Sequence, residues 1–248
     1  MQGFWEKNQT TIVPWLFLSP ALFMFSVYVI YPIIQSLILG FYEWDGLSPD
    51  KVFVGFGNYL ELFDDEVFWT SLKNNIIWVV LYLLAPPIGL GIALFLNQQG
   101  AVMRLVKSLF FFPFVISQIV VGLVFTWFYD PSFGLLNKVL MGLHIISEPL
   151  ALLSSETGVT WAIIGAGLWP QIAYCMILYL TGLNGVNKSL IEAAEIDGCT
   201  GLHTLWHIIL PQLRPATFIA IVVTVIGSLR SFDLIAIMTQ GGPYNSSS

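Results

Sequence analysis

The feature that most constrains the fold is the spacing of the charged residues, which leaves long stretches without any charge. Lys7 and Glu43 enclose 35 uncharged residues, and Lys73 and Arg104 enclose 30. Only 10% of the chain is Asp, Glu, Lys or Arg, compared with about 25% in soluble domains. An apolar run of about 20 residues is long enough for a helix to cross a bilayer. The sequence therefore predicts an all-α integral membrane protein.

Five spans are predicted between these charges, within a single transmembrane domain that covers residues 1–248. They run from about 14–41, 76–96, 108–129, 159–183 and 215–238. The tight segment with Arg104 and Lys107 is expected to be a loop between the second and third spans. The fifth span is the least regular, because Arg230 and Asp233 interrupt it.

Proline is frequent inside the predicted spans. The positions are Pro20, Pro32, Pro86, Pro87, Pro113 and Pro170. Each removes a backbone donor and tends to kink its helix, so freed carbonyls must find partners in neighbouring helices or a wet cavity. Proline is also commoner in membrane helices than in soluble ones. The pattern favours a polytopic helix bundle with a path through it over a passive anchor.

The orientation is predicted from Lys and Arg, which are enriched in the cytoplasmic segments of membrane proteins. With the N-terminus inside, the inner segments carry Lys7, Arg104, Lys107, Lys188 and Arg214, and the outer loops carry Lys51, Lys73 and Lys138. Five bases against three favour a multi-pass protein with a cytoplasmic N-terminus. The loop at 184–214 is then cytoplasmic.

The sequence offers little chemistry to an enzyme. His203 and His207 have the spacing of two metal ligands on a helix, but no Glu lies between them to act as the base of a zinc hydrolase. The stretch "GAVMRLVKS" at 100–108 has Val106 where a phosphate-binding loop requires Gly. We therefore expect no catalytic residue, no metal site and no bound cofactor in this chain. Nine Lys and Arg also make no basic face for nucleic acid.

The two cysteines, Cys175 and Cys199, are expected at different depths, because the first falls inside a span and the second in the cytoplasmic loop. We predict that both are free thiols.

The polar stretch at 187–215 predicts a helix–turn–helix. Ser189 and Glu192 have the spacing of a capping box, and Gly198 suits the left-handed end of the first helix. Thr200 is predicted to cap a second helix, which Pro211 stops. The apolar residues of that helix recur at helical spacing: Leu202, Leu205, Trp206 and Ile209. This pair of helices either packs on its own bundle and the lipid headgroups or docks into a groove of another protein. The first helix has two Ala and three carboxylates and lacks a basic face, which favours protein docking.

The stretch "EAAEIDGCTGLHTLWHIILPQLRP" at 192–215 resembles the EAA loop of binding-protein-dependent ABC transporter permeases. Cys199 stands where that pattern usually has Ala, and Trp206 where it usually has Phe. The stretches "LFLSPALFMFSVYVIYPIIQSLILGF" from 16, "FVGFGNYLELFDDEVFWTSLKNNIIW" from 53 and "SFDLIAIMTQGGPYNSS" from 231 are similar to the carbohydrate-uptake branch, the maltose and glycerol phosphate or MalF-like type.

The resemblance implies a non-catalytic permease subunit of a sugar importer, with the type I importer fold, in a bacterial or archaeal cell (inner) membrane. Its implied partners are a second permease subunit, two ATP-binding subunits that hold ATP and Mg, and an extracytoplasmic solute-binding protein. Closure of the ATPase dimer would push the EAA loop and turn the bundle from inward- to outward-facing. The implied ATPase-coupling residues are Glu192, Ala193, Ala194, Asp197, Gly198, Leu210 and Pro211.

Polar and aromatic residues near the middle of the spans are expected to line the sugar path, as transporter sites lie near the midplane. The candidates are Ser117, Gln118, Trp169, Gln171, Thr224 and Ser228. The alternative is that Ser and Thr only bond between helices. Arg230 and Asp233, three residues apart, are expected to form an outer gate or an ion pair.

Members of this family normally carry a sixth span after the Gly-Gly-Pro element, and this sequence ends at Ser248. We expect that the sixth span is missing because the chain is truncated. Two other functions are open at this point: a transporter or channel subunit that works without an ATPase, and a membrane scaffold without transport activity.

Overall fold

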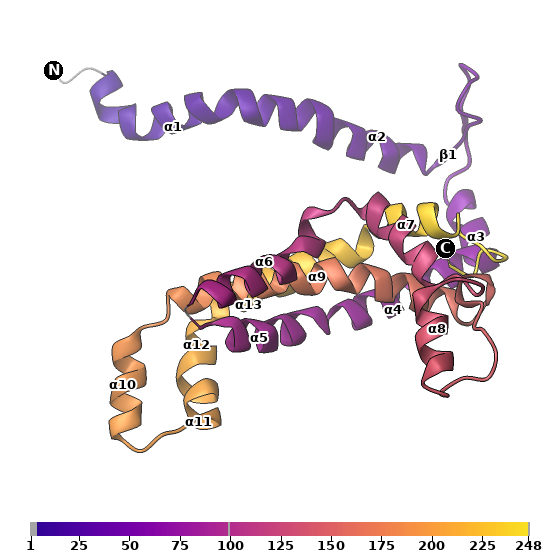
Figure 1. Ribbon diagram of the computed structural model, residues 1–248. Coiled ribbons are helices and arrows are strands. Elements are labelled where there is room, and N and C mark those ends of the chain that lie inside the picture. The colour runs from indigo at the N-terminus through magenta and orange to yellow at the C-terminus, as the bar shows by residue number, and fades with distance from the viewer. Residues whose placement is uncertain (1–3, 99, 248) are drawn as a thin grey trace. The chain divides into compact units, whose positions relative to one another are not determined.

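The computed structural model of the protein describes residues 4–98 and 100–247 (Figure 1). It divides into two compact units, Met1–Phe68 and Trp69–Ser248. Within the described residues, three helical stretches are long and apolar enough to cross a membrane: Thr10–Leu39, Glu66–Leu96 and Val159–Asn184. Two strongly bent helix pairs bring the number to five if each pair is one span. The chain is thus a mostly helical, multi-pass membrane protein.

The first unit begins with a long apolar helix. Three segments make it continuous: α1 (Phe4–Phe25), the π-helical turn Ser26–Ile30 and α2 (Tyr31–Leu39). The π turn ends two residues before Pro32, whose ring and missing N–H disturb the regular hydrogen-bond ladder. The helix therefore accommodates Pro32 by forming a wider π-helical turn and continues through it.

A short antiparallel hairpin follows, formed by β1 (Tyr42–Glu43) and β2 (Val52–Phe53), and then α3 (Gly57–Asp64). Between the strands, the Asp45 carboxylate accepts hydrogen bonds from the backbone N–H groups of Ser48 and Leu47 and from the Ser48 hydroxyl. These bonds favour the charged form and lower the pKa of Asp45 to about 2.

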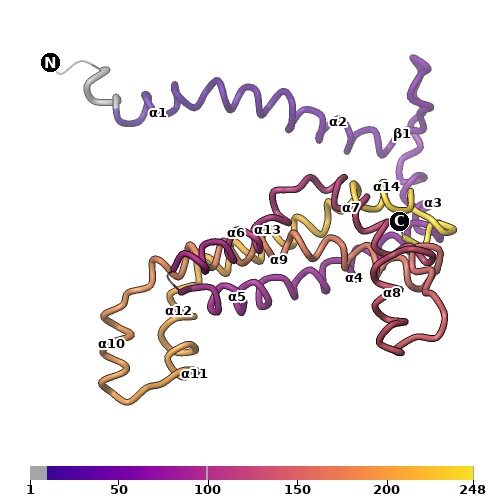
Figure 2. Tube along the Cα trace, in the orientation of Figure 1, coloured from indigo at the N-terminus to yellow at the C-terminus, as the bar shows by residue number. Residues whose placement is uncertain are grey.

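The core of the second unit lies around α9 (Val159–Asn184), and α4 (Glu66–Tyr82) leads into α5 (Ala85–Leu96), which packs closely along it. At Gly89 the two backbones almost touch, since an added Cβ would lie 2.8 Å from the Met176 nitrogen. Figure 2 shows α5, α6 and α13 running beside α9.

The third predicted span, 108–129, falls on two helices rather than one. The structure has α6 (Ala101–Val115) and α7 (Gln118–Phe128), which meet at a bend of 99°. Pro113 weakens the end of α6 by removing a backbone donor, and the Ser117 side chain caps α7 by accepting the Val120 N–H at 3.4 Å. Helix α6 also begins earlier than expected, so the predicted loop around Arg104 and Lys107 is helical.

The fifth predicted span, 215–238, is also interrupted. It consists of α13 (Arg214–Leu229), which packs on α9, and α14 (Phe232–Met238), which packs on α7. The break falls at Arg230, whose backbone (φ −112°, ψ 30°) has left the helical region.

The end of the second unit that contains α14 is closed by short elements and by the returning chain. They are α8 (Leu135–Gly142), the 3₁₀ turn Leu152–Ser154 and the segment after α14. In that segment the carbonyl of Ser246 accepts hydrogen bonds from the side chains of Asn74 (2.8 Å) and Thr160 (3.1 Å). The Gly-Gly-Pro element is therefore held against α4 and α9.

Candidate functional site

The 184–214 loop projects from one end of the second unit as two helical arms (Figure 1). The first arm is α10 (Lys188–Ile196). The second is a helix made of α11 (Leu202–Thr204), the π-helical turn Leu205–Ile209 and α12 (Leu210–Gln212). It meets α13 at a bend of 72°. The predicted helix–turn–helix is confirmed.

The start of the first arm differs from the prediction. Asn187, not Ser189, is the N-cap: its Oδ1 accepts the Ser189 N–H at 3.0 Å and the Ser189 hydroxyl at 2.8 Å. The predicted capping box of Ser189 and Glu192 is wrong, because the helix begins two residues before the register that it needs. Glu192 is left exposed instead of bonding back to the helix start.

The turn at the end of the first arm agrees with the prediction. Gly198 has a φ of +82°, the left-handed conformation that costs Gly little. The Cys199 N–H bonds to the Ala194 carbonyl at 2.8 Å, and the Gly198 N–H bonds to the Glu195 carbonyl at 3.1 Å. These two bonds form a Schellman motif, which ends the helix and turns the chain sharply.

The second arm departs from the prediction at both ends. Gly201 (φ +51°) occupies its N-cap without a side-chain bond, so Thr200 does not cap it. Pro211 does not stop it either, since helix continues to Gln212. The π turn Leu205–Ile209 ends two residues before Pro211, as another ends two residues before Pro32, and supplies the wider backbone that an internal proline needs. Pro215 lies in the first turn of α13, where a missing backbone N–H costs no helical hydrogen bond.

Gln212 joins the two arms at their base, a role that the sequence analysis did not identify. Its Oε1 accepts the Asn187 N–H at 3.0 Å, and its Nε2 donates to the Ile208 carbonyl at 2.9 Å. One side chain thus fixes the start of α10 relative to the end of α12. A glutamine at this position gives no periodic or motif signal from which the role could be predicted.

The tips of the arms carry apolar side chains that stand in solvent. The exposed fractions are 87% for Ile196, 73% for Leu202 and 65% for Trp206. Of the seven predicted coupling residues, Glu192, Ala193, Asp197, Gly198 and Pro211 are exposed, Leu210 is half-buried and Ala194 is buried. Exposed apolar residues gathered on a projecting element are typical of an interaction surface.

A cavity of about 600 Å³ in the second unit brings together residues from α7, α9 and the break between α13 and α14. It contains four of the predicted residues: Gln118, Gln171, Arg230 and Asp233. Within the described part of the chain, Arg230 and Asp233 form no ion pair. The ion pair expected as one alternative is therefore absent, because the break between the helices removes the regular three-residue spacing.

Thr224 and Ser228 are buried behind this cavity rather than in its wall. The Thr224 hydroxyl accepts a hydrogen bond from Gln171 Nε2 at 2.8 Å, and the Ser228 hydroxyl donates to the Val225 carbonyl at 2.8 Å. Thr224 thus positions the Gln171 amide, and Ser228 bonds only to its own helix. The bond of Thr224 joins α13 to α9, which is the between-helix bond of the alternative, whereas the bond of Ser228 stays within α13.

Two predicted path residues do not reach this cavity. Ser117 caps α7. Trp169 packs edge-to-face on Phe125 (5.7 Å between centroids) and lines a separate, largely apolar cavity of about 360 Å³. The 600 Å³ cavity therefore contains the two glutamines, Arg230 and Asp233, and Trp169 lies outside it.

His203 and His207 stack with their ring centroids 4.1 Å apart, and His207 Nδ1 lies 3.0 Å from the His203 carbonyl oxygen. Both side chains are exposed. Cys175 and Cys199 are free thiols, as predicted.

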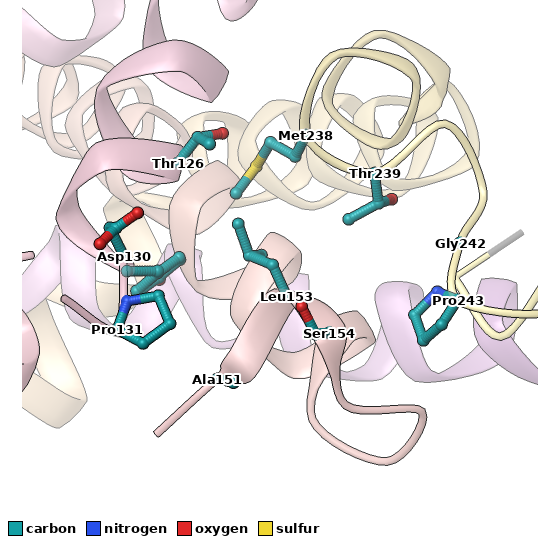
Figure 3. Close-up of a pocket in the computed structure, with 11 residues that line it drawn as sticks. Thr126, Asp130, Pro131, Ala151, Leu153, Ser154, Met238, Thr239, Gly242 and Pro243 are labelled. Atoms are coloured by element: carbon teal, nitrogen blue, oxygen red, sulfur yellow. The ribbon is translucent and has the colours of Figure 1, made fainter. Parts of the chain in front are cut away.

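A further cavity, of about 490 Å³, lies at the end of the second unit that contains α8 and α14. Figure 3 shows side chains of Thr126 and Asp130 on one side of it and Pro243 of the Gly-Gly-Pro element on the other. No sequence pattern predicts this cavity, because its wall combines segments that lie more than 100 residues apart.

Comparison with known proteins places this arrangement in a family. Residues 85–247 match the model of the "Binding-protein-dependent transport system inner membrane component". The chain is similar to the probable ABC transporter permease protein YurN of Bacillus subtilis (34% identity over 240 residues, 95% of this chain and 82% of the relative). It is also similar to the lactose transport system permease protein LacF of Rhizobium radiobacter (33% over 247 residues, 97% and 81%).

A third relative is the sn-glycerol-3-phosphate transport system permease protein UgpA of Agrobacterium fabrum (31% over 237 residues, 94% and 79%). Among solved structures, a chain of a bacterial ABC transporter that imports the acidic polysaccharide alginate has a similar fold. The TM-score is 0.79 at 22% identity, covering 98% of this chain and 82% of that one. The chain therefore belongs to the family of binding-protein-dependent transport system inner membrane components, the permease subunits of ABC importers.

Proposed function

We propose that this permease subunit carries a sugar or related polyhydroxylated solute, and that its 184–214 loop couples transport to a partner ATPase. The observation that carries the proposal is the form of the loop: two arms, fixed at their base and at their turn, that hold apolar side chains in solvent. An element that transmits a push must be rigid and must be attached to a span, and the second arm continues into α13 across one residue.

The surface of the first arm suits a protein partner better than lipid headgroups. Glu192, Glu195 and Asp197 are exposed on and just after α10, against one base, Lys188. An acidic arm is repelled by anionic lipid but fits a protein cleft that has basic side chains. The exposed Ala193 permits close approach, and Glu192 has no ion-pair partner within the described residues.

The proposed solute path includes the cavity with Gln118, Gln171, Arg230 and Asp233. Amide and charged groups bind hydroxyl groups through directed hydrogen bonds, which suits a sugar. Thr224 supports this role by fixing the Gln171 amide from behind. The names of relatives that transport lactose and glycerol phosphate support a solute of this class.

The remaining partners are part of the same proposal. A second permease subunit completes the path, two ATP-binding subunits hold ATP and Mg, and a solute-binding protein delivers the sugar from the side opposite the 184–214 loop. The N-terminus is cytoplasmic, as the Lys and Arg distribution favours. We assign no catalytic step to this chain.

Two substitutions in the loop test the proposal in the assembled transporter, reconstituted with its partner subunits. Gly198→Leu imposes a side chain on a left-handed backbone, and Glu192→Lys reverses an exposed charge. We expect both variants to insert in the membrane normally but to lose solute uptake while ATP hydrolysis continues. Uptake and hydrolysis are measured in the same vesicles.

Matched variants separate coupling from misfolding. Gly198→Asn introduces a residue that tolerates the left-handed conformation, and we expect this variant to keep much of the uptake that Gly198→Leu loses. An added Cβ at Gly198 meets nothing within 4 Å. The effect of Gly198→Leu therefore comes from strain in the left-handed backbone and not from a steric clash. Uptake at the original level in both Gly198→Leu and Glu192→Lys would disprove the coupling role.

The competing hypothesis is a transporter or channel that works without an ATPase. It predicts that the chain purifies without an ATP-binding subunit and still transports solute. A scaffold predicts no solute-dependent activity in either preparation. Purification in mild detergent followed by reconstitution distinguishes all three.

A further inference from the structure

A small cavity of about 270 Å³ lies between α6 and α9, apart from the 184–214 loop and from the cavity with Gln118 and Gln171. Its wall is formed by Lys107, Ser108, Phe111, Met176, Ile177 and Leu180. Four of these lining residues are apolar or aromatic: Phe111, Met176, Ile177 and Leu180. The two polar ones, Lys107 and Ser108, lie nearest the start of α6. The cavity therefore has a polar end and an apolar end, the division that a phospholipid also has.

Lys107 forms the polar end. Its side chain is half-buried, and its Nζ donates a hydrogen bond to the Gln98 carbonyl at 3.1 Å, which holds the ammonium beside the cavity. An ammonium has three donors, so two are available to a ligand. The Ser108 hydroxyl donates to the Arg104 carbonyl at 3.1 Å and therefore adds only acceptor capacity. The cation is the group that would bind a ligand.

The two helices that form this cavity carry no carboxylate to compensate the positive charge of Lys107. Arg104 lies one turn before Lys107 on α6 and is exposed. There is no Asp or Glu between Glu66 and Asp130, and α9, which forms the other wall, also has none. Lys107 in the wall of this largely apolar cavity, with Arg104 one turn before it on α6, attracts an anion that carries an apolar body.

The depth of the cavity also fits a lipid. Lys107 lies about two turns inside α6, while its ammonium reaches back to Gln98, before the helix begins. A long basic side chain whose stem is in apolar surroundings and whose charge points outward is placed at a membrane interface. Basic cavities between membrane helices are known to take the headgroups of anionic lipids.

We infer that this cavity binds an anionic phospholipid, with the headgroup phosphate on Lys107 and Arg104 and the start of an acyl chain along Phe111 and Met176. The same end of the unit carries the 184–214 loop (Figure 1), so the proposed orientation assigns the lipid to the cytoplasmic leaflet. The site itself does not depend on the proposed solute or on the coupling role.

The test uses the assembled transporter in lipid nanodiscs or mild detergent, with phosphatidylglycerol and phosphatidylcholine as probes and native mass spectrometry as the readout. We expect preferential retention of phosphatidylglycerol, reduced about fivefold by Lys107→Gln, which corresponds to roughly 1 kcal/mol per base near a membrane surface. Arg104→Gln should reduce retention further, and raised salt should weaken it. Lys107→Arg keeps the charge and should retain the lipid.

Lys138→Gln is the matched control, since it removes the same charge from the exposed face of α8 at the other end of the unit. We expect it to leave lipid retention unchanged. Equal retention of both lipids, or no effect of Lys107→Gln, would overturn the inference. Displacement by millimolar inorganic phosphate or glycerol phosphate would identify a soluble phosphate as the ligand. Loss of a partner subunit from the Lys107→Gln complex in either lipid would show that the bases contact protein instead.

Discussion

At the scale of single residues, one missing side chain determines how closely the two central helices approach. A Cβ on Gly89 would lie 2.7 Å from the Cys175 Cβ and 2.8 Å from the Met176 nitrogen. Neither atom is the end of a flexible side chain, so the helices themselves would have to move apart. In membranes, where helix association depends on close packing, small residues at such contacts have a large effect.

Gly89→Ala is therefore expected to destabilise the second unit by roughly 1–3 kcal/mol, the usual cost of overpacking. Gly91→Ala, on the same helix, is the control, because an added Cβ there meets nothing within 4 Å. Its helix propensity should leave stability equal or slightly higher. The measurement is the midpoint of thermal unfolding in detergent. Equal midpoints for the two variants would show that α5 and α9 do not rely on this contact.

Residue chemistry also explains which path residues could be predicted. Gln171 was found from its polarity inside an apolar run, and the structure places it on the cavity. Trp169 also lies in the middle of that predicted span. It is two positions from Gln171 on α9, however, and residues two positions apart lie on nearly opposite faces of a helix. Composition identifies polar and aromatic residues in a span, whereas the face that meets the cavity depends on the packing of α7 and α13.

At the scale of elements, the same residue type has different results in different helices. Pro113 and Pro170 both lie inside predicted spans. Helix α6 ends two residues after Pro113, while α9 continues unbroken past Pro170, which is buried among α9's neighbours. A proline weakens a helix at a known position, but the surrounding helices decide whether it bends. The apolar runs thus predicted where helices form, and not the 99° bend.

The 184–214 loop shows which local signals are reliable. Gly198 was predicted correctly because a left-handed helix end depends almost entirely on the residue itself. The N-cap of α10 was predicted wrongly, because Asn187 and Ser189 are both good capping residues. Which of the two begins the helix depends on where α9 ends. The bond from Asn187 to Gln212 joins positions 25 residues apart, and such a contact has no sequence pattern.

Gln212→Leu should loosen the base of the loop, because it removes two hydrogen bonds worth about 1 kcal/mol each. We expect faster amide hydrogen exchange at 185–190 and weaker coupling of ATP hydrolysis to uptake. Gln212→Glu keeps an acceptor for the Asn187 N–H and loses the donor to Ile208, so its exchange should be intermediate. Unchanged exchange in Gln212→Leu would mean that the arms are held together by packing alone.

At the scale of the whole molecule, the charge-free runs constrain topology more strongly than they constrain tertiary structure. The apolar stretch Glu66–Leu96 is long enough to cross the membrane once. Its two ends must then lie on opposite sides, whatever the arrangement of the other helices. By contrast, the cavity that joins Gln118, Gln171 and Arg230 requires the packing of three separate helices, which no single run predicts.

Cysteine labelling of the two flanking loops tests this topology together with the proposed orientation. Leu47→Cys and Asn97→Cys each place a thiol at an exposed loop position on either side of Glu66–Leu96, in a background with Cys199→Ser. Cys175 is buried and can stay. In right-side-out vesicles, a membrane-impermeant maleimide should label Leu47→Cys and not Asn97→Cys, and inverted vesicles should give the reverse. Labelling after denaturation in detergent confirms that both thiols are present.

The opposite labelling pattern would invert the orientation and place the 184–214 loop away from any cytoplasmic ATPase. Labelling of both thiols from one side would show that Glu66–Leu96 does not cross the bilayer.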